Sequence, residues 1–365
     1  MQIKKISEIL IASADAALLL QSKDGSFPSG HNGPYYDPET PVRNTAHYLF
    51  LLSELYSRIG DEKYKIAAEK AANYFFSIQA RPGNKTFFFR NKQGKDKCNG
   101  LIGQAWVIEA LIKASIAFDR NDYYELADEI FSLHPWDDRL NIWKRVDIDG
   151  HILSFDVTFN HQLWFAAAGS MLYKSDLAQY RVGKFVESVL GCMKLYKDGV
   201  IFHSSAMATY WNYLLSGRKI FLLELKRRLL NRIRFKRLYL KSVGYHAFNL
   251  YALSILAKSF PNSAIWSNDK LKKVLEVRHN VKFLDALNHS EFAFWYNVSG
   301  LEMAFAIETF IKNDEEVKAW INKQFTMTYT DDANALENGA VDKNTARSRV
   351  YEMARLIKDY EVQIS

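Results

Sequence analysis

The chain is poor in cysteine and proline, and its apolar residues do not gather into long uninterrupted runs. Only two of the 365 residues are cysteine, Cys98 and Cys192, which argues against a disulfide framework and fits a reducing compartment. No Cys/His spacing indicates a zinc site, so neither a metal nor another cofactor is expected. The few prolines and glycines lie mostly in expected loops, and no linker divides the chain. We therefore expect a single domain over residues 1–365.

The N-terminal segment resembles a signal peptide only superficially. Lys4 and Lys5 precede an apolar run, but Glu8 and Asp15 interrupt that run, and its apolar residues recur at helical spacing. An amphipathic helix over Ile6–Gln21 is the better interpretation. No stretch of the sequence is expected to span a bilayer, and we expect a cytoplasmic protein.

Acidic residues are scarce in one segment, and this local deficit accounts for the net charge of the chain. Residues 218–241 hold ten basic residues and one acidic residue, so their charge of +9 leaves the rest of the chain near −2. Residues 205–242 are expected to be a basic helical insertion. Its mixture of apolar and basic residues favours peripheral contact with an anionic membrane, with a solvated helix packed on the protein as the alternative. No nucleic-acid motif accompanies it.

Helical periodicity dominates the remaining sequence and recurs with a period near 55–60 residues. Each repeat begins with a helix that is apolar on most sides and continues with a more amphipathic one. Such pairs cannot bury their apolar faces alone, so a closed ring of stacked pairs is expected. The expected pairs are 45–59 with 62–79, 101–118 with 122–133, 160–173 with 177–196, 245–260 with 268–286, 294–311 with 314–325, and 345–360 with 6–21.

A short cluster of His, Asn, Asp, Tyr, Trp or Arg lies at the start of each of the six apolar helices. We call these clusters the polar knots; they are residues 30–47, 98–106, 155–164, 243–249, 291–300 and 342–349. A ring of helices would bring all six knots to one rim, where they can share a pocket. Residues 86–90 and 148–155 are expected to form short hairpins on that rim.

This pattern resembles the (α/α)6 toroid of the six-hairpin glycosidase-like superfamily, whose members include uronyl hydrolases, sugar epimerases and heparinase-type lyases. The segment NGLIGQAWVIEAL at 99–111 is similar to inner-helix starts of uronyl epimerases, and FNHQLW at 159–164 to Asn-His segments of heparinase-like lyases. QSKDGSFP at 21–28 resembles a repeat of terpene-cyclase toroids, but the chain lacks their acidic motifs. The resemblance implies an all-α fold and saccharide processing at the rim.

Two polar knots contain the candidate catalytic residues. The 30–47 knot offers Tyr36, Asp37 and Arg43, and the 155–164 knot offers Asp156 and His161. Glycoside hydrolysis would need two carboxylates on either side of one bond. Elimination or epimerisation would instead need a base, an acid and a cation to stabilise an enolate-like carboxylate, for which His161, Tyr36 and Arg43 are candidates. The residue types leave the choice open.

The other polar and aromatic residues of the knots are candidates for substrate binding, with a structural role as the alternative for each. Aromatic rings beside polar groups commonly line sugar-binding clefts. These candidates are His31, Glu39, Asn44, His47, Gln104, Trp106, Gln162, Trp164, His246, Trp295 and Tyr296.

The sequence therefore predicts a carbohydrate-active enzyme that acts on an acidic, uronic-acid-type oligo- or polysaccharide. Hydrolysis, β-elimination and epimerisation all remain open as the reaction. A cytoplasmic location together with a membrane-contacting helix favours surface-polysaccharide metabolism. A non-catalytic saccharide-binding or assembly protein of a polysaccharide pathway is the alternative.

Overall fold

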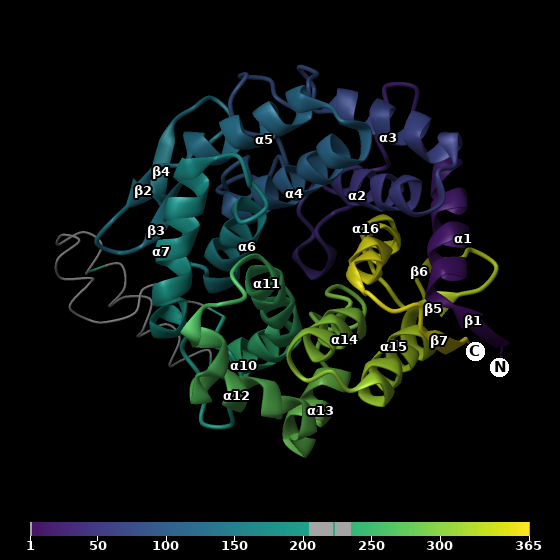
Figure 1. The fold of residues 1–365 in the computed structure, drawn as a ribbon, viewed down its shortest axis with the longest axis vertical. Helices are drawn as coiled ribbons and strands as arrows, with labels where there is room; N and C mark the ends of the chain where they lie inside the picture. The colour runs from purple at the N-terminus through teal and green to yellow at the C-terminus, as the bar shows by residue number, and fades with distance from the viewer. Residues whose placement is uncertain (1, 204–221, 223–234, 365) are drawn as a thin grey trace.

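The fold is a ring of helices, and the computed structural model describes residues 2–203, 222 and 235–364. Five α-helices and one short helical segment form the inner layer (Figure 1). Each inner helix contacts the next around the ring, and the last segment contacts the first helix. The inner layer consists of α2 (Val42–Ile59), α4 (Gly100–Phe118), α6 (Phe159–Gly169), α11 (His246–Ser259), α14 (Ser299–Phe310) and α16 (Lys343–Ser348) with the 3-10 helix Arg349–Arg355.

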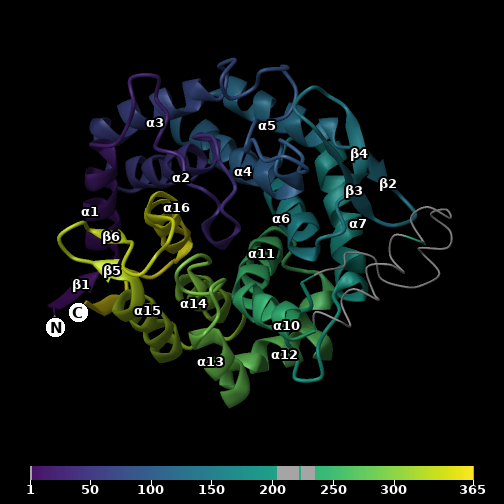
Figure 2. The same cartoon turned by 180° about the vertical axis from the view of Figure 1, so that it is seen from behind.

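A second layer of helices surrounds this ring (Figure 2). Most outer helices pack antiparallel on the inner helix that precedes them in the chain, as expected for helical hairpins. The outer helices are α1 (Ile6–Leu18), α3 (Glu62–Tyr74), α5 (Asn121–Leu133), α7 (Asp176–Cys192), α12 (Asp269–Glu276), α13 (Val281–Asn288) and α15 (Asp314–Thr328), and α10 (Phe235–Gly244) leads into α11. The (α/α)6 toroid expected from the sequence is confirmed.

The first hairpin illustrates how local sequence produces this architecture. Gly60 ends α2 with a φ of 70°, a left-handed conformation that glycine adopts without strain. Asp61 then caps α3, because its carboxylate accepts a hydrogen bond from the Lys63 backbone N–H at 3.0 Å. Helix α2 is buried along most of its length, whereas α3 buries only one face.

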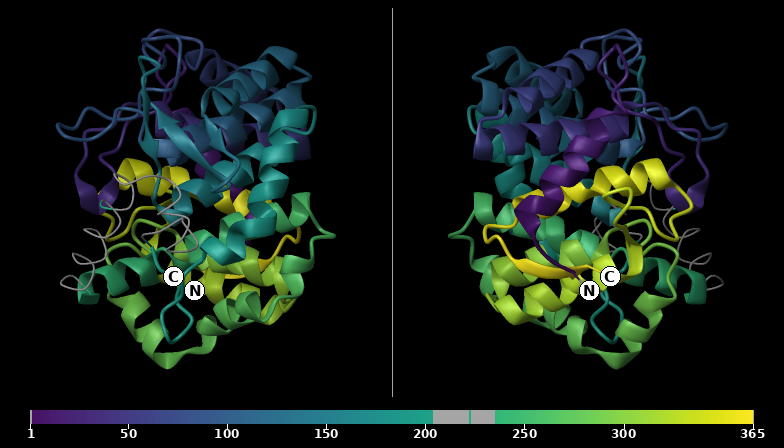
Figure 3. Two further views of the ribbon diagram at one scale, coloured as in Figure 1. Left: turned by 90° about the vertical axis from the view of Figure 1, so that its left-hand side faces the viewer. Right: turned by 90° about the vertical axis from the view of Figure 1, so that its right-hand side faces the viewer.

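The two ends of the chain close the ring together (Figure 3). Strand β1 (Gln2–Lys5) pairs antiparallel with β7 (Glu361–Ile364), so that Gln2 lies opposite Ile364. Inside the ring, the fully buried Arg349 guanidinium lies 2.8 Å from Glu302 of α14 and 2.5 Å from Glu352. Burial raises the pKa of Glu302 well above its usual value, and the nearby Glu352 carboxyl raises it further. This ion cluster joins the last inner segment to its neighbour.

Two expected helices differ from the structure. The expected helix 345–360 is instead a short α16, a 3-10 helix and a turn before β7, because this segment must pass from the inner layer to the closing strand. The expected outer helix 268–286 is divided into α12 and α13 by the 3-10 turn Val277–His279. Asn280 begins α13 by accepting hydrogen bonds from two backbone N–H groups.

The rim carries short strands, and one of the two hairpins expected from the sequence is among them. Strands β2 (Trp136–Asp137), β3 (Ile142–Val146) and β4 (Ile152–Phe155) form a three-stranded sheet, and β5 (Tyr329–Thr330) pairs with β6 (Ala335–Leu336). The expected hairpin at 86–90 is absent, since Arg90 makes only an isolated bridge with Glu39. Its neighbours Phe87 and Phe89 are buried as core residues.

By length and composition alone, helix α4 could cross a membrane. This differs from the expectation that no segment of the chain could do so. The apolar window of this helix is 78% buried, because its neighbours in the ring surround it. Most of the basic segment 218–241 lies outside the described residues. Of that segment, the structure describes residue 222 and residues 235–241. Residues 235–241 belong to α10.

Two buried glutamines fasten the rim loops onto the inner helices in the same way. The Gln104 side chain accepts a hydrogen bond from the Phe87 N–H and donates to the carbonyl groups of Phe87 and Cys98. The Gln162 side chain accepts from the Trp143 N–H and donates to the carbonyl groups of Trp143 and Asp156. Each clamp therefore satisfies three buried backbone groups and holds the loop that precedes its helix.

We expect Gln162→Leu to lower the free energy of unfolding by at least about 2 kcal/mol, because three buried backbone groups lose their partner. Gln93→Leu is the matched control, since Gln93 is exposed in a loop, and its cost should stay within about 0.5 kcal/mol. Denaturant unfolding followed by circular dichroism measures both values. Equal stability of the two variants would contradict the clamp.

Candidate active site

All six polar knots contribute to one cavity at the end of the ring where the inner helices begin. The cavity has a volume of about 160 Å³. Five cationic side chains line it, and none of the described residues that line it is Asp or Glu. The lining residues are Asn32, Tyr35, Arg43, Arg90, Lys95, Asn99, Ile102, Trp106, Thr158, Asn160, His161, His203, Lys241, Tyr245, Phe248, Tyr296, Asn297 and Arg349.

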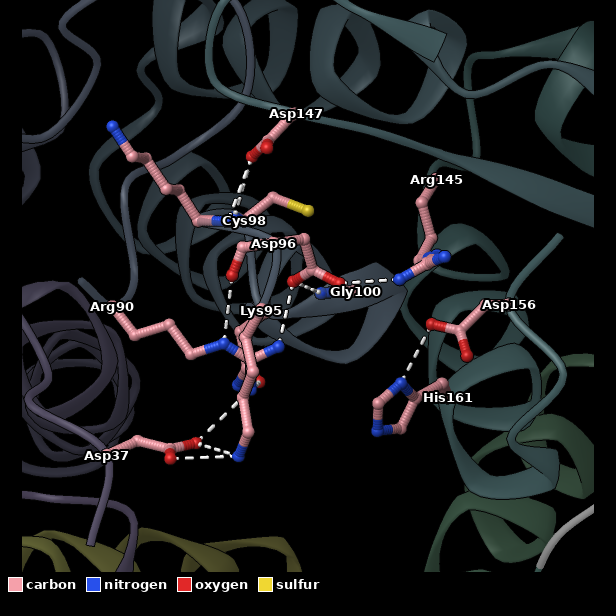
Figure 4. Close-up of polar contacts among 12 residues, drawn as sticks. Asp37, Arg90, Lys95, Asp96, Cys98, Gly100, Arg145, Asp147, Asp156 and His161 are labelled. Atoms are coloured by element: carbon pink, nitrogen blue, oxygen red, sulfur yellow. Dashed lines mark hydrogen bonds and ion pairs between the residues drawn. The ribbon is translucent and has the colours of Figure 1, made fainter. Parts of the chain in front are cut away.

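A histidine–aspartate pair at the start of α6 provides the clearest acid–base group of the cavity (Figure 4). His161 Nδ1 lies 2.8 Å from Asp156 Oδ2. Because the carboxylate can only accept, Nδ1 carries the proton and the Nε2 lone pair is available. Nε2 makes no hydrogen bond within the described part of the chain, and His161 lines the cavity. The pair can therefore accept a proton from a ligand.

Backbone groups and nearby cations hold Asp156 in its ionised form. Oδ2 accepts a hydrogen bond from the Leu101 N–H at 3.1 Å, and Oδ1 accepts one from the Thr158 N–H at 3.2 Å. Burial alone would raise the pKa of Asp156, but its interaction with His161, with the charge of Arg145 and the Leu101 N–H, lowers it to about 2. Asp156 thus stays negative at neutral pH and stabilises the imidazolium that forms when His161 takes a proton.

Two buried arginines with unused N–H groups also line the cavity. The side chains of Arg43 and Arg349 are only 2% and 1% exposed. Arg43 donates through Nη2 to Asn32 at 2.9 Å, whereas its Nε and Nη1 atoms and the Nε of Arg349 have no hydrogen-bond partner. Buried donors of this kind are normally paired, and planar guanidinium groups match carboxylates well. The two arginines are therefore suited to bind an anionic ligand.

A second group of cations, Arg90 and Lys95, comes from the loop before α4 (Figure 4). Lys95 Nζ lies 2.8 and 2.7 Å from the two oxygens of Asp37, and the Lys95 side chain is 37% exposed. Arg90 binds Asn99 at 2.7 Å and Asp96 at 2.8 Å. Asp96 also accepts a hydrogen bond from Arg145 at 2.6 Å, which links this loop to the β3 strand behind His161. These ion pairs fix the loop and leave the cavity wall positive.

Tyrosine hydroxyl groups supply neutral hydrogen-bonding groups to the cavity. The hydroxyl oxygens of Tyr35 and Tyr245 are 2.9 Å apart, and Tyr296 donates to Asn32 Oδ1 at 2.6 Å. Burial raises the pKa of Tyr35 and of Tyr245 well above the usual value. Both phenols are therefore protonated at neutral pH and can donate a proton or a hydrogen bond to a ligand.

The structure places the five catalytic candidates at different distances from the cavity. Arg43 and His161 line it, and Asp156 lies directly behind His161. Asp37 is fully buried and bound to Lys95 and Arg90. Burial alone would raise its pKa, but Lys95, the Asn32 amide and Arg90 together lower it. Tyr36 lies outside the lining, because its side chain is 61% exposed and stacks on His31. Its neighbour Tyr35 faces the cavity instead.

Of the binding candidates, only Trp106 and Tyr296 line the cavity. Gln104 and Gln162 are the loop clamps, so we assign them a structural role in place of substrate binding. The remaining candidates make internal contacts: His31 with Val341, Glu39 with Arg43, Asn44 with Pro28, His47 with Ser348, Trp164 with Phe248, His246 with Ile201 and Val274, and Trp295 with Phe294. Burial raises the pKa of Glu39 to about 7 and lowers that of His246 to about 4.

Sequence reasoning missed several cationic and amide side chains of the cavity. Arg90, Lys95 and Lys241 lie in or beside basic stretches that are usually solvated, so their composition gave no signal. Asn32 and Asn99 could have been found, because they lie within the polar knots. Within the described residues, no group of three His, Cys, Asp or Glu side chains could hold a metal ion.

The same arrangement of helices is found in solved structures of several carbohydrate enzymes. A cellobiose 2-epimerase from Bacillus thermoamylovorans matches 95% of this chain and 98% of its own, with a TM-score of 0.62 and 11% identity. A D-mannose isomerase matches 96% and 95%, with a TM-score of 0.63 and 13% identity. An α-1,6-mannanase of Salegentibacter, a glycoside hydrolase, matches 96% and 98%, with a TM-score of 0.56 and 12% identity. These structures share the (α/α)6 toroid fold.

A relative with much higher sequence identity defines the family. The archaeal glycosylation protein Q of Haloferax volcanii is 40% identical over 98% of this chain and 99% of its own length. This chain therefore belongs to the family of archaeal glycosylation protein Q. No protein-family model matches the sequence.

Gly100 is the position where a small change should disturb the histidine–aspartate pair. Its φ is +61°, and an added Cβ would lie 2.5 Å from Asp156 Oδ2 and 2.8 Å from His161 Nδ1. We expect Gly100→Ala to displace the pair and to cost at least about 1 kcal/mol more stability than Gly94→Ala. Gly94 is a matched control, because its φ is +77° and nothing lies within 4 Å of its added Cβ.

The measurements are denaturant unfolding and the side-chain NMR signals of His161, identified by their loss in His161→Gln. Those signals should move in Gly100→Ala and stay in place in Gly94→Ala. Unchanged His161 signals in Gly100→Ala would show that the close approach of Gly100 does not hold the pair in position.

Proposed function

We propose that this protein is a sugar epimerase of a glycosylation pathway, and that it inverts the carbon next to the carboxylate of a uronic acid. His161 is the base, Asp156 orients it, and Arg43 and Arg349 bind the carboxylate of the sugar. The observation that supports this proposal best is the composition of the cavity. It combines an oriented histidine with five cations and, among its described lining residues, has no carboxylate.

This composition favours proton transfer at carbon over hydrolysis. Hydrolysis of a glycoside by the usual route needs two carboxyl groups that face the bond. The mannanase with this fold is described as inactive when two aspartates are replaced. In the present chain Asp37 is paired with Lys95 and Arg90, and Asp156 is paired with His161. Neither carboxylate is left to attack or to protonate a glycosidic bond.

The proposed step balances within these residues. His161 Nε2 takes the proton from the carbon that bears the carboxylate, and the electron pair of the broken C–H bond moves into the carboxylate. The resulting enediolate carries an additional negative charge. The unused N–H groups of Arg43 and Arg349 therefore stabilise the enediolate more strongly than they stabilise the bound substrate. A tyrosine hydroxyl, from Tyr35 or Tyr245, gives a proton to the carbon from the other face. The imidazolium of His161 then releases its proton to solvent and the tyrosinate takes one up, which restores both residues.

The charge of the cavity also supports an acidic substrate. Lys95 and Arg90 already bind carboxylates, those of Asp37 and Asp96. The buried guanidinium groups of Arg43 and Arg349 instead have N–H groups without a partner, which are costly until a ligand binds them. A volume of about 160 Å³ is small for a ligand pocket, so we propose that one sugar unit enters it rather than a long chain. The family relationship to a glycosylation protein supports a role in building a glycan.

The test is solvent-hydrogen exchange into methyl glucuronide in D2O, followed by NMR of the proton next to the carboxylate. We expect the wild-type protein to exchange this proton and to produce the epimer. His161→Gln should reduce the rate by about 10²–10⁴-fold, because proton transfer to a positioned base is lost. His151→Gln is the matched control, since His151 is exposed in the β3–β4 turn and should leave the rate unchanged.

Each alternative reaction has its own readout in this experiment. β-Elimination would give the ultraviolet absorbance of an unsaturated uronate, and hydrolysis would give methanol without exchange at carbon. Binding of the glucuronide without any of these products would indicate a saccharide-binding protein and would contradict the proposed enzyme. Equal rates in His161→Gln and wild type would contradict the role of His161.

A further inference from the structure

Lys241 is the cation of the cavity that has no carboxylate partner among the described residues. It lies near the end of α10, is half-buried, and lines the cavity. Arg43, Arg90, Lys95 and Arg349 each have a carboxylate within 3.4 Å, whereas Lys241 has none among the described residues. A half-buried ammonium without a counter-charge is costly, and an anionic ligand would remove that cost.

The surroundings of Lys241 increase this demand for an anion. Its Nζ lies 4.9 Å from the centre of the Tyr35 ring, and Lys95 Nζ lies 5.5 Å from the centre of the same ring. Burial, together with the charges of Lys95 and Arg237, lowers the pKa of Lys241 to about 8. Both ammonium groups approach the same ring and repel each other, so a doubly charged anion beside them would be stabilised.

This pair of lysines lies nearer to solvent than the arginine pair. Lys95 is 37% exposed and Tyr35 is half-buried, whereas Arg43 and Arg349 are almost completely buried. Beside the lysines, Lys92 is 41% exposed and lies 4.0 Å from Asp37, which adds positive charge on the outer side. The cavity therefore has a buried site with two planar guanidinium groups and an outer site with compact ammonium groups.

The two sites suit different anions. Planar guanidinium groups match the two oxygens of a carboxylate, whereas a lysine acts as a point charge and accepts the tetrahedral oxygens of a phosphate. We propose that Lys241, with Lys95, binds a phosphate group attached to the sugar, so that the substrate is a sugar phosphate or phosphodiester rather than a free sugar. This inference rests on the proposed function, because it places the sugar itself beside Arg43 and Arg349.

The phosphate could belong to a nucleotide-activated sugar or to a lipid-linked one, and both present the same chemistry to Lys241. Binding is measured by isothermal titration with glucuronic acid, glucuronic acid 1-phosphate and UDP-glucuronic acid, and farnesyl phosphate is added as a competitor. We expect the 1-phosphate to bind at least about tenfold more tightly than the free acid. A further gain with the nucleotide indicates a nucleotide sugar, and competition by farnesyl phosphate indicates a lipid-linked sugar.

Lys241→Met should abolish this advantage, which means that the ratio of the two dissociation constants falls close to one. Lys236→Met is the matched control, because Lys236 belongs to the same helix and carries the same charge but does not line this cavity. It should keep the tenfold ratio. Unfolding curves of both variants show whether either substitution has disturbed the fold.

The pH dependence separates the role of the Lys241 charge from a structural role. The ammonium form is the one that binds phosphate, so the advantage of the 1-phosphate should be full below pH 8 and should decline as the pH rises through about 8. In Lys241→Arg the guanidinium stays charged, so the advantage should persist to higher pH. A merely structural Lys241 would give the same pH profile in both proteins.

The outcomes distinguish this inference from the proposed function. Equal affinities of the wild-type protein for the free acid and the 1-phosphate would overturn the phosphate site while leaving the epimerase proposal intact. An equal loss of affinity for both ligands in Lys241→Met would also overturn it, because Lys241 would then bind the carboxylate. Exchange at carbon that is absent with the free acid and with the 1-phosphate would instead contradict the proposed function.

Discussion

Helices that are apolar on nearly every side can be buried only by one another, and this constraint determines the rest of the molecule. Helix α4 has buried residues along most of its length, as do α2, α11 and α14. A closed ring is the arrangement that gives each of them two inner neighbours and an outer cover. The same closure brings the N-terminal ends of the inner helices to one rim, where residues far apart in sequence line one cavity.

The ring and the shared cavity could be predicted from the sequence because both depend on periodicity. Apolar spacing locates the helices, and the polar knots mark their N-terminal ends. The broken outer helix at α12 and α13 and the 3-10 segment after α16 could not be predicted in this way. Their apolar spacing is helical, but other contacts decide the backbone: Asn280 starts a new helix at α13, and the segment after α16 must pass to the closing strand.

The orientation of individual side chains within a knot depends on backbone details that composition does not reveal. Tyr36 has a φ of 49° and Asn32 a φ of 62°, and these left-handed residues lie on either side of the turn that points Tyr35, not Tyr36, toward the cavity. Ion pairing is equally hidden: Asp37 is an acidic residue of the correct knot, yet Lys95 from a separate loop neutralises it. Lys241 was not recognised because it lies at the edge of a basic segment whose charge suggested an outward-facing surface.

The glutamine clamps have a consequence for how such a ring changes over evolutionary time. Gln104 and Gln162 occupy corresponding places in successive hairpins and use the same set of hydrogen bonds. Each binds both backbone groups of one extended residue, Phe87 or Trp143, and the carbonyl group six positions upstream. The attachment of each loop is thus separate from the side chains that the loop presents. Insertions and substitutions between the two attachment points can create new specificity while the helices keep their packing, so the scaffold is modular one hairpin at a time.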